Sequence, residues 1–233
     1  MVKGPRAADH SPSAVKATTE APPAKADAAV SKKPQRKPAS RYHHGDLRRA
    51  LMDAALIVVR DEGVDAVRMN ALAQQLRVSV AAPFRHFATR DALLVALAEE
   101  GAHKMVEAID AAVARANEGI DREQARGVAY VRFAVEHTAW FRLLARRDLL
   151  AMSETLSALS ASQEALMEAV LGRHIGERSP EVASAGVLAA QAITYGLARM
   201  ITDGLLGKVS ADDAEALARE VTNVLGEGLM PRS

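Results

Sequence analysis

Residues 69–93, MNALAQQLRVSVAAPFRHFATRDAL, carry the pattern that most narrows the fold of this 233-residue chain. An apolar stripe at helical spacing ends at Leu76, and the pair Arg77-Val78 follows it as a tight turn. Ser79 is a candidate N-cap for a second, short helix, because its hydroxyl can accept a hydrogen bond from an amide of the first turn. The stretch therefore predicts two short helices joined by a turn, and a long helix that begins after Thr89.

The charge of this stretch has one sign. No acidic residue lies between Asp65 and Asp91, and the arginines in that interval are Arg68, Arg77, Arg85 and Arg90. A compact helix pair with a basic surface is what the phosphate backbone of a DNA duplex requires. The alternative is an ordinary helical hairpin with aromatic side chains in its core and a solvated basic face, and this would explain Phe84 or Phe87 taken alone. The whole constellation predicts DNA binding.

Composition favours an all-α protein, because Ala, Leu, Glu and Arg are abundant and runs of β-branched residues are few. The absence of cysteine excludes a disulfide framework and a thiolate metal site.

No signal segment opens the chain, and no apolar run approaches the roughly 18 residues that cross a bilayer, so we expect a cytoplasmic protein with no membrane partner. Phosphate-binding glycine loops and nucleophile elbows are absent as well, which argues against an enzyme. We expect no cofactor and no metal, since His43 and His44 lack a third ligand at helical spacing.

Residues 1–40 differ from the rest of the chain. They hold eight Lys/Arg against three acidic residues, six of the nine prolines, and no periodic apolar face. Such a segment cannot bury enough surface to offset the ordering of its backbone, so it predicts a disordered basic tail. The tail is either an arm that follows DNA phosphates or a solubilising leader, and the sequence leaves both open.

The runs HHGDLRRALMDAAL (43–56) and VSVAAPFRHF (78–87) resemble the TetR/AcrR family of transcriptional regulators. The resemblance is to a branch with a Trp-His-Gly run in its penultimate helix, where this chain has Thr194-Tyr195-Gly196. It implies a three-helix helix-turn-helix DNA-binding domain over residues 41–90 and a C-terminal helical bundle for ligand binding and dimerisation over 91–233. It further implies a homodimer that binds a palindromic operator in double-stranded DNA and is released by an effector.

Two positions depart from the family pattern. Arg77 stands where the family turn usually has glycine, and a non-glycine residue at positive φ costs on the order of 1 kcal/mol. Pro83 falls inside the short DNA-reading helix, where it removes one backbone hydrogen bond. The resemblance places Arg85 in the major groove, next to small residues that touch thymine methyl groups. Carried over position by position, it implies DNA contacts from Arg41, Arg68, Asn70, Ser79, Val80, Ala81, Ala82, Phe84, Arg85, His86 and Arg90, with Phe87 in the core.

The C-terminal part offers two further sets of candidate residues. Aromatic residues at helical spacing predict an effector cavity, although plain core is the alternative for each: Tyr130, Phe133, His137, Trp140, Phe141, Tyr195 and Arg199. Few charges lie among them, so we expect a small apolar or aromatic effector. The helix over residues 183–201 is apolar nearly all round, which predicts packing on its own core and on a partner. The candidate dimer interface comprises Leu188, Ala192, Leu217 and Val221.

These patterns together predict a ligand-responsive regulator, a repressor that binds its operator as a homodimer. The alternative is a DNA-binding regulator without a small-molecule effector, controlled by a protein partner or constitutive.

Overall fold

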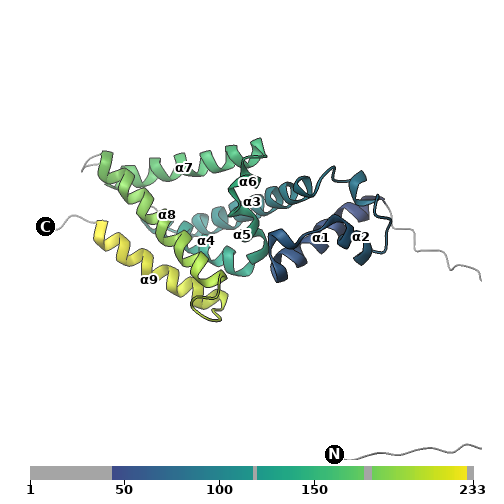
Figure 1. Ribbon diagram of the computed structural model, residues 1–233. Helices are drawn as coiled ribbons and strands as arrows, with labels where there is room; N and C mark the ends of the chain where they lie inside the picture. Colours follow the sequence, from purple (N-terminus) through teal and green to yellow (C-terminus); the bar gives the residue numbers. More distant parts are fainter. Residues whose placement is uncertain (1–43, 118–119, 176–179, 230–233) are drawn as a thin grey trace, which may run out of the picture. The chain divides into compact units, whose positions relative to one another are not determined.

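The computed structural model describes residues 44–117, 120–175 and 180–229. Within these ranges the chain forms only helices and the turns between them (Figure 1), so the all-α prediction is confirmed. The predicted tail (1–40) and the predicted DNA contact Arg41 lie outside the described residues. Among the described helices, none is both long and apolar enough to cross a membrane.

The first part of the chain is a helix-turn-helix unit packed around one core. Its elements are α1 (His44–Glu62), the 3₁₀ helix η1 (Val64–Ala66), α2 (Met69–Gln75), the 3₁₀ helix η2 (Pro83–Arg85) and the start of α3 (Arg90–Arg115). Leu51, Val59, Leu72 and Phe87 are buried there against Leu94 of α3. The apolar residues thus recur at helical spacing, so one face of each helix packs into a common core.

The long helix α3 begins where the sequence predicts. Thr89 is its N-cap, and the Thr89 hydroxyl accepts a hydrogen bond from the amide of Ala92 at 3.0 Å. The first turns of α3 place Leu93 and Leu97 in the same core as Leu149 and Leu156 from later in the chain. Packing is therefore continuous across the predicted domain boundary at residues 90/91, and the described residues from His44 onward form one compact unit.

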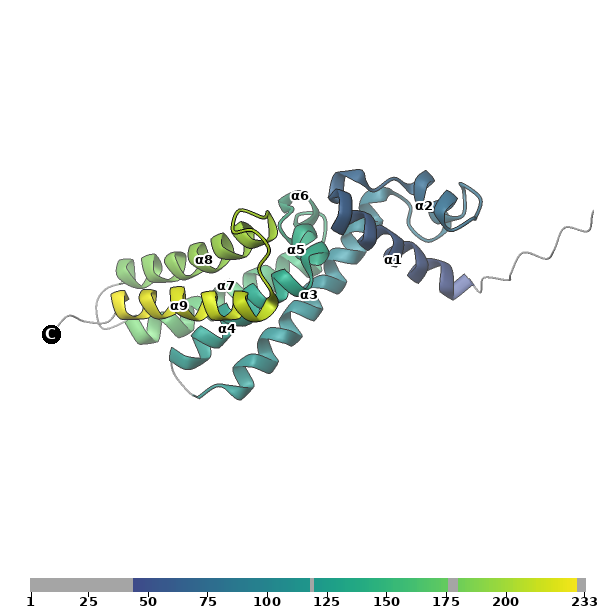
Figure 2. The ribbon, with the colours of Figure 1, turned by 90° about the horizontal axis from the view of Figure 1, so that it is seen from below.

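The remaining helices surround α4. They are α4 (Ile120–Glu136), α5 (Thr138–Leu144), α6 (Arg147–Leu150), α7 (Glu154–Ile175), α8 (Pro180–Thr202) and α9 (Ala211–Leu229). α4 packs on α3, α8 and α9, and α8 runs beside α9 (Figures 1 and 2). A second core joins Val131 of α4 to Phe141, Ala198 and Ala218. This arrangement puts the central helix α4 in contact with both the α3 side and the α8–α9 side of the unit.

Candidate DNA-binding surface and effector cavity

The turn after α2 has the strained backbone that the sequence predicts. Arg77 has φ +55°, and it is the one non-glycine residue with positive φ in the described part of the chain. The turn is closed by two backbone hydrogen bonds, from the amide of Arg77 to Gln74 at 3.1 Å and from that of Val78 to Ala73 at 3.0 Å. The surrounding hydrogen bonds thus hold a left-handed conformation that glycine adopts more easily.

The segment after this turn corrects the expectation that Ser79 caps a second α-helix. Residues 79–82 form turns, and only Pro83–Arg85 are helical, as the 3₁₀ helix η2 with Ala82 as its N-cap. In an α-helix capped by Ser79, residue 83 would donate to the Ser79 carbonyl, and proline has no amide to donate. The amide of Ala82 donates to that carbonyl instead, at 2.9 Å, and Pro83 takes the first helical position.

Residues 77–87, here called the reading segment, rest on two buried anchors and expose the side chains between them. Pro83 and Phe87 are buried, whereas Val80 and Phe84 are 50% and 46% exposed. Arg85 is exposed too. Of the other predicted contacts in this segment, Ser79 and Ala81 are exposed and Ala82 and His86 are half-buried. The segment therefore offers apolar, aromatic and cationic side chains to a partner from one short stretch of chain.

The predicted DNA contacts on either side of the reading segment differ in whether their side chains already form hydrogen bonds within the protein. Asn70 is exposed on α2. The Arg68 guanidinium donates to the backbone carbonyls of Asp65 and Val67. That of Arg90 donates to Val67 at 3.0 Å through Nε and to Val64 at 2.7 Å through Nη2. Arg90 thus ties the start of α3 to the chain that precedes α2.

A cavity of about 420 Å³ lies among α3, α4, α5, α6, α7 and α8, and we call it the inner cavity. Three of the predicted effector residues line it: Tyr130, Phe141 and Tyr195. The Phe141 ring packs edge-on against Tyr130, with centroids 5.9 Å apart, and lies 6.2 Å from the ring of Tyr195. Burial raises the pKa of the Tyr130 hydroxyl above its usual range, which further favours the neutral form that a tyrosine already has at physiological pH.

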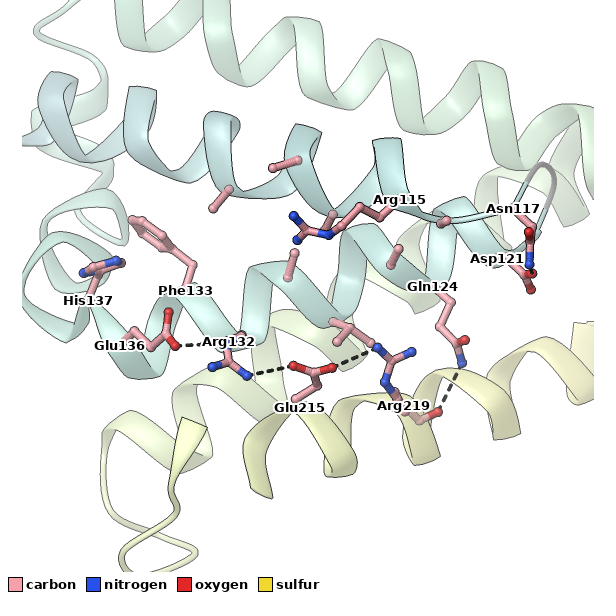
Figure 3. Close-up of a pocket in the computed structure, with 17 residues that line it drawn as sticks. Arg115, Asn117, Asp121, Gln124, Arg132, Phe133, Glu136, His137, Glu215 and Arg219 are labelled. Carbon is pink, nitrogen blue, oxygen red and sulfur yellow. Dashed lines mark hydrogen bonds and ion pairs between the residues drawn. The ribbon is translucent and has the colours of Figure 1, made fainter. Parts of the chain in front are cut away.

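A second, wider space of about 720 Å³ runs along the opposite face of α4, between α3 and α9, and we call it the outer groove (Figure 3). Much of its lining is small: Ala108, Ala111, Ala112, Ala116, Ala125 and Ala129. At its edge Arg132 pairs with Glu136 at 2.9 Å and with Glu215 at 2.8 Å, and Glu215 in turn accepts from Arg219 at 2.8 Å (Figure 3). These paired charges hold α4 against α9.

The structure divides the predicted effector residues among several places. Phe133 and His137 line the outer groove, with their rings 4.8 Å apart. His137 and Trp140 line a small space of about 160 Å³ beside α1. Arg199 pairs with Asp203 at 2.8 Å on the surface of α8. The prediction of a single cavity that contains all seven residues is therefore wrong, because aromatic side chains on successive turns of α4 and α5 face different neighbours.

The candidate dimer residues fall into two classes. Leu188 is 65% exposed and Ala192 is exposed, so α8 presents an uncovered apolar face. Leu217 and Val221 are half-buried because they pack on the second core, whereas Val224 is a large apolar side chain of α9 that is exposed.

Two features of the site escaped the sequence reading. Arg126 is buried on α4, although arginine is rarely buried and the sequence gives it no obvious partner. Gly101 on α3 lies directly under Trp140, where an added Cβ would come within 2.7 Å of the indole. The helical register of α4 relative to Tyr130 was the signal that would have identified Arg126 as an inward-facing residue.

Comparisons with known proteins agree with this architecture. A family model described as bacterial regulatory proteins of the tetR family matches residues 51–97, and one described as a tetracyclin repressor-like C-terminal domain matches residues 124–225. No curated relative matches the chain.

Solved structures are similar over most of the chain. A protein of unknown function from Rhodococcus sp. RHA1 is 30% identical, with a TM-score of 0.61, and the match covers 79% of this chain and 97% of that one. A tetR-family regulatory protein from Rhodococcus RHA1 is 20% identical, with a TM-score of 0.63 over 80% and 98% of the two chains. AibR, solved with isovaleryl coenzyme A and operator DNA, is 16% identical, with a TM-score of 0.56 over 75% and 97%.

Proposed function

Because this chain belongs to the TetR family of bacterial regulatory proteins, which are DNA-binding regulators and not enzymes, we propose that it is a homodimeric transcriptional repressor released by a small-molecule effector. The observation that carries the proposal is the reading segment. Its buried Pro83 and Phe87 fix a short stretch of chain whose exposed side chains suit a DNA groove. A rigid, basic surface element of this size is what major-groove recognition needs.

We assign a role in DNA binding to each residue according to how exposed its side chain is. Arg85 reads a base edge, while Val80 and Ala81 approach thymine methyl groups. Phe84 and His86 lie along the backbone, with Ser79 and Asn70 as phosphate contacts. Arg68 and Arg90 already donate to protein carbonyls, so their main role is to position α2 and α3 beside the reading segment.

We assign the dimer interface to the exposed apolar faces of α8 and α9. Leu188 and Ala192 form its centre on α8, and Val224 extends it on α9 above the half-buried Leu217 and Val221. A single head reads only a few base pairs, so useful affinity requires two heads spaced about one helical turn of DNA, roughly 34 Å, or more apart.

The effector site we propose is the inner cavity. Its volume lies in the range of small-molecule sites, and apolar side chains supply most of its lining. The structural relative AibR was solved with a coenzyme A thioester and operator DNA together, which supports an effector-controlled reading of this fold. One wall is α3, whose first turn begins three residues after the reading segment, so a ligand that tilts α3 moves Arg85. A coupling of about 1–3 kcal/mol is typical of such control.

Selection of duplexes from a random pool with the purified full chain tests the proposal. We expect a palindromic consensus whose half-sites are about one helical turn apart. Binding that random-sequence competitor DNA removes as readily as the selected duplex would instead indicate a sequence-independent architectural protein.

A further inference from the structure

Three arginines lie close together in sequence on α5 and α6, and two of them are already paired within the protein. The Arg142 guanidinium donates to two backbone carbonyls at the end of α1. That of Arg146 pairs with Asp65 at 2.8 Å and with Asp148 at 2.7 Å. Arg147 is exposed and forms no hydrogen bond or ion pair in the described part of the chain. Arg147 is therefore the arginine of this group whose donors are available to a ligand.

Arg147 stands at the opening of the inner cavity. Arg147 and Leu150 both line the cavity and are three residues apart on α6, so they share the face of α6 that borders it. Leu150 is half-buried, whereas Arg147 is exposed to solvent. The methylene groups of an arginine can cover apolar neighbours while its guanidinium stays hydrated. The charge at this opening thus costs the protein little desolvation.

The described lining of the inner cavity has a single charged side chain, which is Arg147. No carboxylate is found among the described residues that line the cavity, so none of them repels an anion there. Farther along α7 and on α8 the lining is polar but uncharged, with Gln163 and Gln191. The negative charge of a ligand therefore has one complementary position, beside Arg147.

The lining next to Arg147 is apolar and belongs to several helices. Leu144 of α5 lines the cavity together with Leu156 and Leu159, which lie on one face at the start of α7. Met105 and Val106 of α3 line the same cavity. An apolar chain attached to an anionic group can therefore bury itself against these side chains while its head stays at the opening. Burial of the chain supplies affinity, and the guanidinium selects the charge of the head.

We propose that the inner cavity binds an amphipathic carboxylate, with the carboxylate paired to Arg147 at the opening and the apolar body inside. A planar guanidinium binds a carboxylate through two parallel hydrogen bonds, which a neutral head group cannot reproduce. One cation matches one negative charge, so the small apolar or aromatic effector expected from the sequence gains a single charged group. The regulatory role of this contact rests on the proposed function, whereas binding at the site does not.

The test is isothermal titration of the full chain with octanoate and with its neutral counterpart, octanamide, at neutral pH. In the wild type we expect octanoate to bind about threefold to tenfold more tightly, a modest preference because solvent screens an exposed guanidinium. Arg147→Met should remove this preference, and Arg147→Lys should keep part of it, because lysine retains the charge and lacks the planar fork. Arg115→Met is the matched control at an exposed arginine of the outer groove, and it should keep the full preference.

A second pair of variants tests whether the apolar body lies in the inner cavity. Leu159→Trp places a larger side chain in the cavity and should weaken octanoate and octanamide alike, by about tenfold or more. Ala158→Trp is the control, because Ala158 is the exposed neighbour on α7 and is not part of the described lining. It should leave both affinities unchanged. Wild-type affinities in Leu159→Trp would place the ligand elsewhere and overturn the proposal.

The charge measurement can fail independently of the proposed function. Absence of octanoate binding to the wild type, absence of a preference over octanamide, or an undiminished preference in Arg147→Met overturns the carboxylate site, whether or not the chain selects an operator. Operator selection is measured separately. A preference that depends on Arg147 in a chain that selects no operator refutes the proposed function and leaves the carboxylate site standing.

Discussion

The reading segment and the inner cavity gather their side chains in opposite ways. The reading segment takes Val80, Phe84 and Arg85 from one stretch of chain and exposes them above two buried anchors. The inner cavity takes its lining from six helices, α3 to α8. A duplex is a partner of nearly fixed shape, which a short rigid element can match, whereas a cavity exists only when several helices hold their relative register.

Arginines near the reading segment also differ from the buried arginine of α4, Arg126. Near the reading segment, Arg90 and Arg146 donate to backbone carbonyls or to acidic side chains, and Arg146 pairs with Asp65 at 2.8 Å. The hydrogen bond from Arg146 lowers the pKa of Asp65, so this exposed carboxylate stays charged to a lower pH than an unpaired aspartate. Such surface pairs position elements at little cost. Arg126 of α4 is instead buried, and its Nε and Nη1 donate to no acceptor in the described part of the chain.

We expect the largest effect from a substitution that disrupts the proposed homodimer, on which operator binding depends. Leu188→Glu places a charge at the centre of the proposed α8–α9 interface, where burial would require its desolvation. We expect monomers by size-exclusion chromatography and a loss of operator affinity of about 100-fold or more, the scale of lost bivalency.

Met152→Glu is the matched control, because Met152 is a comparably exposed apolar residue outside α8 and α9. It should leave the dimer and operator binding unchanged. A monomeric Leu188→Glu protein that binds the full palindrome with wild-type affinity would refute the interface.

The next effect is confined to the reading segment. Arg85→Ala should cost about 1–3 kcal/mol of operator binding and relax specificity at one position in each half-site. Quantitative binding to duplexes altered at each position measures this, with Arg115→Ala as the control at an exposed arginine of α3. If Arg85→Ala weakened binding to all duplexes equally, Arg85 would contact a phosphate instead of a base.

The same contrast explains what could be predicted from the sequence. The strained turn at Arg77 and the start of the long helix after Thr89 depend on neighbouring residues only, and both are confirmed. The helix expected from Ser79 is wrong, although its cause, the missing amide of Pro83, is also local and visible in the sequence. The lining of the inner cavity was predicted only in part. An aromatic residue can be recognised in the sequence, but the sequence does not show which neighbouring helix its side chain faces.

An effect of similar size, on stability instead of operator binding, tests how tightly α3 packs against α5. Gly101→Ala on α3 would bring a methyl group within 2.7 Å of Trp140 Cδ1 and 2.9 Å of Trp140 Cγ on α5. Such overpacking should lower the free energy of unfolding by about 1–3 kcal/mol in urea titrations. Gly226→Ala on α9 is the control, since its added Cβ meets no atom within 4 Å and should stabilise by up to about 1 kcal/mol. Equal effects of the two substitutions would mean that Trp140 moves freely over α3.

The smallest effect concerns the turn that presents the reading segment. Arg77 holds φ +55°, so Arg77→Gly removes a strain of about 1–2 kcal/mol, and glycine gives back about half of it through the greater freedom of the unfolded chain. We expect a net stabilisation below about 1 kcal/mol, measured by urea unfolding. Arg77→Val supplies the opposite control, because a β-branched side chain tolerates positive φ poorly and should destabilise the protein. If valine and glycine gave the same stability, the backbone at this turn would not be strained, and the rigidity assigned to the reading segment would have to come from Pro83 and Phe87 alone.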